Sequence, residues 1–224
     1  MSLPRRPRAV IFDMDGLIVD TEVLYREAMI TAVAARGYDM PPTRYMETIG
    51  MPGDAARNAL RDFFEPDFDL DSLWNDAKRR FHELTRARRY LKAGVEELLD
   101  VLDAVGTPRA IATSSGHDDV RLHLSSHGLV GRFDAIVAQG DYPRGKPNPD
   151  PYLKAADLLA VEPTWCLALE DSHNGVRAAS EAGMMTVMIP DLLHPTEEMH
   201  RLCVRIADDL HEVRDLIEMF DRTS

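Results

Sequence analysis

Outside the stretch 17–89, hydrophobic residues of this 224-residue chain follow two alternating patterns. Short runs rich in β-branched and other apolar residues are typical of strands buried on both faces of a parallel sheet. Such runs occupy residues 9–12, 108–113, 133–138, 165–169, 184–189 and 203–207. Helical spacing of apolar residues marks the segments between them, at 94–105, 117–126, 148–159, 174–182 and 210–220. Strands that alternate with helices predict an α/β fold, a doubly wound, mostly parallel, Rossmann-like sheet.

A different pattern fills the stretch between the first strand and residue 90. It contains no strand-like run, and helical spacing is present at 21–36, 43–64 and 70–89. Pro41-Pro42 and the acidic stretch EPDFDLD separate these segments. We therefore expect a core domain built from residues 1–16 and 90–224, with an inserted α-helical cap domain at 17–89. The cap would lie over the carboxyl edge of the sheet, because it leaves from the tip of the first strand.

Composition narrows the range of partners. The formal net charge of −12 argues against binding to nucleic acid or to an anionic membrane, since both need a basic surface. No apolar run approaches the roughly 20 residues of a membrane span, and the N-terminus lacks an apolar signal core. Cys166 and Cys203 lie in apolar, strand-like segments and are expected to be buried free thiols. The expectation is a cytoplasmic protein, with a monomer as the default state.

Polar residues gather at the predicted ends of four strands. They are Asp13 and Asp15, Thr113 to Ser115, Lys146, and Glu170 with Asp171. In a parallel sheet these ends meet at one edge, where ligands bind. Converging carboxylates need a cation, and Mg²⁺ suits oxygen ligands, while hydroxyls at a helix start and a lysine suit phosphate. Each feature alone has an ordinary alternative: a turn, a helix cap, favourable helix-end charge or a solvated lysine. Asn148 is expected to cap the helix that follows Lys146.

Four motifs in this order carry a resemblance to a known family. DMDGLIVDTE, IATSSG, GKPNPDPY and LEDSHNG resemble the signature motifs of the haloacid dehalogenase superfamily. More narrowly, they resemble its branch with a helical cap after the first motif, which includes β-phosphoglucomutases and many sugar-phosphate phosphatases. The resemblance spans nearly the whole chain. It implies a phosphoric monoester hydrolase that uses Mg²⁺ and takes a small phosphorylated metabolite.

The resemblance also implies catalytic roles. Asp13 would be the nucleophile that forms an aspartyl phosphate, and Asp15 would be the general acid and base. Lys146 would pair with Asp13 and with the phosphate, and Thr113 would bind phosphate oxygens. A covalent intermediate divides one difficult displacement into two easier steps. A carboxylate two residues after the nucleophile separates phosphoryl transfer from the carbon–halogen chemistry of the superfamily's dehalogenases.

Phosphate and metal ligands follow from the same resemblance. Backbone N–H groups near Ser114 and Ser115 would assist in binding phosphate. Asp171 would hold Mg²⁺ together with the Asp13 carboxylate and the Asp15 main-chain carbonyl. Glu170 would be a direct ligand or a partner of the ligands.

The choice between phosphatase and mutase depends on the cap. Thr21 matches a threonine of the phosphosugar mutases, but Tyr25 occupies the position of their histidine four residues later. The cap loop around Gly50, which would contact substrate, has Gly53 where their phosphate-gripping arginine would align, although Arg57 could substitute. We therefore expect a phosphatase, with a β-phosphoglucomutase-like enzyme as the alternative. A catalytically idle module that binds a phosphorylated ligand is a second alternative, although no nucleophile or metal carboxylate is missing.

Overall fold

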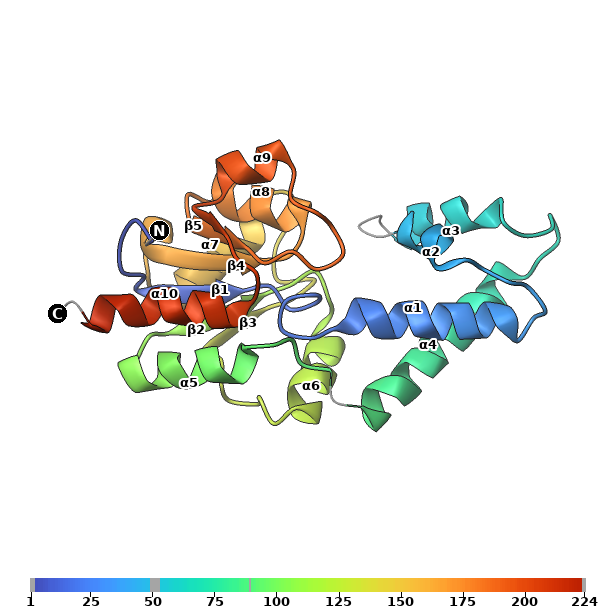
Figure 1. Cartoon of the computed structure of the whole chain (residues 1–224), viewed down its shortest axis with the longest axis horizontal. Coiled ribbons are helices and arrows are strands. Elements are labelled where there is room, and N and C mark those ends of the chain that lie inside the picture. The colour runs from blue at the N-terminus through green and yellow to red at the C-terminus, as the bar shows by residue number, and fades with distance from the viewer. Residues whose placement is uncertain (1–2, 49–52, 89, 223–224) are drawn as a thin grey trace. The chain divides into compact units, whose positions relative to one another are not determined.

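The computed structural model describes residues 3–48, 53–88 and 90–222. The chain divides into two compact units, whose residues can be followed by colour in Figure 1. The core unit comprises Met1–Val19 and Leu91–Ser224, and the helical unit comprises Asp20–Tyr90. The first boundary thus falls after Val19 rather than after residue 16, because Val19 pairs with Asp15 and with Leu91 of the core unit.

A single parallel sheet organises the core unit. Its strands are β1 (Ala9–Phe12), β2 (Arg109–Ala112), β3 (Ala135–Val137), β4 (Cys166–Glu170), β5 (Met185–Met188) and β6 (Arg205–Ile206). Their order across the sheet is β3-β2-β1-β4-β5-β6, and every pair is parallel. The chain therefore builds outward from β1 in one direction and then returns to its other side. In sheets of this kind, ligands bind at the carboxyl ends of the strands where the order reverses, which here are β1 and β4.

Helices flank the sheet, as the alternating pattern predicted (Figure 1). They are α5 (Val95–Val105), α6 (His117–Ser126), α7 (Asp150–Leu158), the short 3-10 helix η1 (Pro163–Trp165), α8 (His173–Glu181), α9 (Glu197–Leu202) and α10 (Leu210–Arg222). One layer of the core joins Ala9 and Ile11 of β1 to Tyr152 of α7 and Ala178 of α8. Alternate residues of β1 point to the opposite face, so all four residues of this strand are buried. The doubly wound α/β fold expected from the sequence is confirmed.

The helical unit has its own apolar centre. Its helices are α1 (Thr21–Ala34), α2 (Pro42–Met46), α3 (Gly53–Arg61) and α4 (Leu70–Ala87). Helices α1 and α4 pack along each other, and Met29 and Val33 of α1 share a buried cluster with Leu73 and Ala77 of α4. The segment 43–64 was expected to be helical throughout, but in the described residues α2 ends at Met46 and α3 begins only at Gly53.

Three local expectations were wrong. Pro149 rather than Asn148 stands at the cap position of α7, because the Asn148 side chain instead donates to the Gly145 carbonyl at 2.9 Å. Helix α9 was not predicted. It ends at Leu202, shortly before strand β6, and β6 is only two residues long. Cys203 therefore follows α9 and is half-buried, whereas Cys166 is buried in β4, and both are free thiols. Among the described residues, no helix is long and apolar enough to span a membrane.

Candidate active site

Asp13 and Glu170 meet at the point where the strand order reverses. Phe12 at the end of β1 pairs with Leu169 of β4, and the Asp13 N–H donates to the Leu169 carbonyl at 3.0 Å. On the far side of β4, the Ile189 N–H donates to the Glu170 carbonyl at 2.7 Å. Backbone pairing thus brings two carboxylates to the same level of the sheet, although they are far apart in the sequence.

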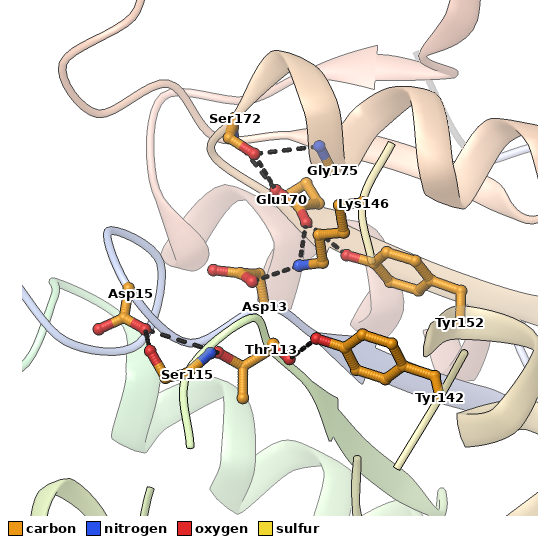
Figure 2. A network of polar contacts seen from close by, with 10 residues as sticks. All are labelled: Asp13, Asp15, Thr113, Ser115, Tyr142, Lys146, Tyr152, Glu170, Ser172 and Gly175. Carbon is orange, nitrogen blue, oxygen red and sulfur yellow. Dashed lines mark hydrogen bonds and ion pairs between the residues drawn. The ribbon is translucent and has the colours of Figure 1, made fainter. Parts of the chain in front are cut away.

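Lys146 joins these two carboxylates (Figure 2). Its ammonium donates to Asp13 Oδ1 in a short contact and to Glu170 Oε1 at 2.6 Å. The side chain is only 6% exposed, and the loop that carries it has a cis peptide bond before Pro147. A buried lysine is tolerated here because two anions compensate for the loss of hydration.

Both carboxylate oxygens of Glu170 accept hydrogen bonds. Besides Lys146, the Tyr152 hydroxyl donates to Oε1 at 2.6 Å, while the Ser172 backbone N–H and hydroxyl donate to Oε2 at 3.2 and 3.0 Å. The Ser172 hydroxyl in turn accepts from the Gly175 N–H at the start of α8. Gly175 is required at this position, because a Cβ atom there would overlap the Glu170 carboxylate. Glu170 is fully buried, and these hydrogen bonds orient its carboxylate (Figure 2).

The electrostatics of the cluster favour an additional cation. Burial, together with the negative charges of Glu170 and Asp15, raises the pKa of Asp13 to about 8, although Lys146 opposes the shift. Burial likewise raises the pKa of Asp171 well above its ordinary value, and Asp13 and Glu170 add to the effect. Burial would lower the pKa of Lys146, but the two carboxylates outweigh it and hold its pKa above the ordinary value. One lysine therefore does not balance all the negative charge.

The donor set fits a hard divalent ion. Single carboxylate oxygens of Asp13, Glu170 and Asp171 lie within 4.8 Å of one another. Because Glu170 already accepts four hydrogen bonds, Asp13 and Asp171 are the carboxylates better placed to ligate a metal. Oxygen ligands of this kind suit Mg²⁺, whose charge would offset the burial and the repulsion that raise both pKa values.

Asp15 lies on the other side of Asp13, next to the residues that follow β2. Its Oδ2 accepts from the Ser115 hydroxyl at 2.6 Å and is 3.5 Å from Thr113 Oγ1. The Ser115 N–H, expected to face phosphate, instead donates to Thr113 Oγ1 at 3.0 Å. Ser114, the next residue in the chain, is exposed. The Tyr142 hydroxyl donates to the Thr113 carbonyl at 3.0 Å. Figure 2 shows this second group of contacts below the Lys146 cluster.

The remaining expected site residues belong to the helical unit. Thr21 is the first residue of α1 and is buried. Arg57 of α3 pairs with Asp71 in a short contact and lies 5.6 Å from the centre of the Trp74 ring. Their roles in substrate binding remain predictions, and Gly50 lies outside the described residues.

Two residues of the cluster were missed from the sequence. Tyr152 and Tyr142 were assigned no role, although Tyr152 closes the motif GKPNPDPY. A tyrosine in the first turn of a helix that starts beside Lys146 is the signal that could have found it. For Ser115, only the backbone was considered, whereas its hydroxyl holds Asp15.

Comparison with known proteins identifies the family of this chain. The chain matches the haloacid dehalogenase-like hydrolase family over residues 10–189, and it belongs to that family. It is 32% identical to hexitol phosphatase B of Escherichia coli over 200 residues, covering 85% of this chain and 86% of the relative. It is also 32% identical to the fructose-1-phosphate phosphatase YqaB of Escherichia coli, covering 81% of this chain and 96% of the relative.

A solved structure shares the fold over almost its full length. The crystal structure of CbbY from Rhodobacter sphaeroides in complex with phosphate has a TM-score of 0.75 and 28% sequence identity. The match covers 92% of this chain and 96% of that protein. The family expected from the four motifs is therefore confirmed.

Proposed function

We propose that this protein is a Mg²⁺-dependent phosphatase that hydrolyses a small phosphate monoester through an aspartyl phosphate on Asp13. The observation that carries the proposal is the cluster of Asp13, Lys146, Glu170 and Asp171 at the reversal point of the sheet. The relatives' names support the class of phosphoric monoester hydrolase, which the sequence also predicts. The mechanism follows from the residues.

Asp13 supplies the nucleophile. One oxygen of its carboxylate is held by Lys146, so the other is free to attack phosphorus in line with the leaving oxygen. The P–O bond to the alcohol breaks as the new Asp13–phosphorus bond forms. Lys146 offers positive charge to the phosphoryl oxygens, because its ammonium is buried and its position is fixed by Glu170.

Asp15 moves the protons. In its protonated form it gives a proton to the leaving alkoxide, and as a carboxylate it then takes one from the water that attacks the aspartyl phosphate. The Ser115 hydroxyl holds the Asp15 carboxylate at 2.6 Å in this structure. This contact fixes the acid next to Thr113, which we propose as a ligand of the phosphoryl oxygens.

Asp13 and Asp171 would hold Mg²⁺, with the Asp15 main-chain carbonyl as a further ligand. The ion would supply charge neutralisation that lets Asp13 react as a carboxylate despite the raised pKa. Glu170 contributes by fixing Lys146, because its four hydrogen bonds leave it oriented towards the ammonium.

The helical unit supports a phosphatase over a mutase. Tyr25, at the position of the mutase histidine, packs against Tyr45 and Phe81 with ring centres 6.5 and 5.5 Å away. Burial and then Glu22 raise its pKa to about 12, so it keeps its proton at neutral pH. It therefore cannot replace a histidine in proton transfer. Phosphorylated sugars and polyols are the substrates to test first, since the relatives' names specify them.

A panel of phosphate esters, including hexose and hexitol phosphates and p-nitrophenyl phosphate, tests the proposal. Phosphate release should require Mg²⁺, stop on adding EDTA, and be lost in Asp13→Asn. Asp100→Asn, which changes an exposed carboxylate on α5, is the matched control and should retain full activity.

The alternatives have their own outcomes. Release no greater than that of Asp13→Asn across the whole panel would favour a module that binds a phosphorylated ligand without turnover. Conversion of β-glucose 1-phosphate to glucose 6-phosphate in the presence of a trace of bisphosphate, without free phosphate, would identify a mutase instead.

A further inference from the structure

Asp191 is a buried carboxylate with one unsatisfied oxygen. It follows β5 after Ile189 and Pro190, and its side chain is only 10% exposed. Lys92 donates to Asp191 Oδ1 at 2.7 Å. Asp191 Oδ2 is buried and has no hydrogen-bond partner among the residues that the structure describes. Leaving a carboxylate oxygen buried and unpaired is costly, so a donor absent from the protein chain is expected to satisfy it.

The unsatisfied oxygen lies close to the proposed metal ligands. A Cβ atom built on Gly16 would lie 2.9 Å from Asp171 Cγ and 3.4 Å from Asp191 Oδ2. Both carboxylates therefore border the same point of the loop that follows Asp15. Lys92 pairs with one oxygen of Asp191, and a cation bound at this edge would compensate the remaining negative charge.

Asp191 lies outside the group of carboxylates that could bind one metal ion directly. Within the described part of the chain, the group of carboxylate oxygens all within 4.8 Å of one another includes Asp13, Glu170 and Asp171, but not Asp191. Mg²⁺ usually keeps several water ligands, and these waters are strong hydrogen-bond donors. A carboxylate just outside the metal ligands can accept a hydrogen bond from one of these waters.

We propose that Asp191 is a positioning residue of the metal site: its Oδ2 accepts a hydrogen bond from a water ligand of Mg²⁺, and Lys92 fixes its orientation. The inference rests on the proposed Mg²⁺ site and adds to it a residue that none of the four motifs contains. Partners of this kind typically alter metal affinity by about 10- to 100-fold.

Lys92 connects this carboxylate to the segment that returns from the helical unit. Its backbone N–H donates to the Ile18 carbonyl at 3.0 Å, and the preceding Leu91 pairs with Val19. The competing explanation is therefore a salt bridge that only anchors this segment. The two explanations differ in what they predict for metal binding.

Mn²⁺ binding to the 224-residue chain, measured by electron paramagnetic resonance, separates the two explanations. Asp191→Asn keeps an oxygen for Lys92 but replaces the acceptor Oδ2 with a donor. The Kd for Mn²⁺ should rise by about 10- to 100-fold, while the melting temperature in EDTA should stay the same or increase. Asp76→Asn is the matched control, because Asp76 has a similarly buried, ion-paired side chain within the helical unit. It should leave the Kd unchanged.

A lower melting temperature in EDTA with an unchanged Kd would overturn the inference and identify a structural salt bridge. The variant Asp171→Asn distinguishes an error in the role of Asp191 from an error in the proposed metal site. If the wild-type protein binds Mn²⁺ and Asp171→Asn does not, but Asp191→Asn binds normally, only the role of Asp191 is wrong. If the wild-type protein binds no Mn²⁺, the proposed metal site itself is wrong and the role of Asp191 falls with it.

Discussion

Charged side chains at the carboxyl ends of the core strands are buried, whereas many of those on the helices of the other unit face solvent. Lys146 and Glu170 are 6% and 0% exposed and share a hydrogen bond. Arg79 and Glu83 of α4 form an ion pair as well, but they are 62% and 61% exposed. Both pairs join a basic side chain to a glutamate, but they differ in how far they are exposed to water.

This difference shows which charges are available for chemistry. In the helical unit, several arginines pair with carboxylates of the same unit, as Arg79 does with Glu83 and Arg88 with Glu27. Exposed pairs of this kind contribute little, since water and salt screen them. In the core unit, burial forces charges into fixed positions and shifts their pKa values. Burial, rather than the number of charges, therefore distinguishes the candidate site from the rest of the surface.

Removing the buried ammonium should have the largest effect. Lys146→Met deletes the only cation that contacts both Asp13 and Glu170 among the described residues. We expect kcat to fall by about 10²- to 10³-fold, because a fixed positive charge at the phosphoryl group is lost. Steady-state kinetics on the best substrate of the panel measures this. Lys154→Met, on an exposed lysine of α7, is the control, and equal losses in both variants would contradict the comparison.

The second prediction concerns pH and the metal-free protein. The pKa of Asp13 is raised to about 8 in the folded state, above its ordinary value of 3.8. The folded state therefore keeps a proton that the unfolded chain releases, so this group opposes folding increasingly as pH rises from about 4 to about 8. The effect is absent below this window and complete above it. Asp13→Asn removes the titrating group.

Urea unfolding in EDTA at several pH values tests this. The stability of Asp13→Asn relative to wild type should increase with pH, by on the order of 1 kcal/mol per pH unit within the window. Asp141→Asn should behave in the opposite way at lower pH, because a hydrogen bond from the Ala138 N–H lowers the pKa of Asp141. If the relative stability of Asp13→Asn did not depend on pH, the carboxylate would not be buried as described.

Sequence reasoning recovered the sheet and the charges at its strand ends for a physical reason. Buried parallel strands are short apolar runs, and polar residues directly after them can only lie at the carboxyl edge. The same rule applies to Asp191, which follows the fifth run after Pro190. Its partner Lys92 is 99 residues away in the sequence, and no local pattern links the two.

Other features depend on packing that periodicity does not encode. Tyr152 holds Glu170 only because α7 presents that side of its first turn to β4. Helix α9 is six residues long, which is too short for a clear apolar period, although Thr196 caps it through the Met199 N–H. Asn148 does not cap α7 as expected, because its side chain donates a hydrogen bond to the Gly145 carbonyl in the loop before the helix. Side-chain partners were thus less predictable than the elements that carry them.

The third prediction tests whether Glu170 must be held in place. Tyr152→Phe removes the hydroxyl that donates to Glu170 Oε1 at 2.6 Å and keeps the ring in the apolar layer. The free energy of unfolding should fall by about 1–3 kcal/mol, because a buried charged acceptor loses one donor. If Glu170 then holds Lys146 less firmly, kcat should fall while KM for substrate changes less. Tyr142→Phe, which loses a bond to the Thr113 carbonyl instead, is the comparison. Unchanged stability and kcat in Tyr152→Phe would show that Lys146 and Ser172 suffice.

The smallest effect is expected on the solvent-facing side of the comparison. Arg79→Gln combined with Glu83→Gln removes the Arg79–Glu83 ion pair of α4 while keeping both side chains long and helix-compatible. It also removes the contact of Arg79 with Asp76, which keeps Arg36 and Arg80 as partners. Because both partners are mostly exposed, the free energy of unfolding should change by no more than about 0.5 kcal/mol, and kcat should stay at the wild-type value. Raising the salt concentration should shrink even this change, since screening acts on exposed pairs first. Urea unfolding at low and high salt measures it. A loss of activity comparable to that of Lys146→Met would mean that these exposed charges act on substrate, and that burial does not separate the reactive charges of this protein from the others.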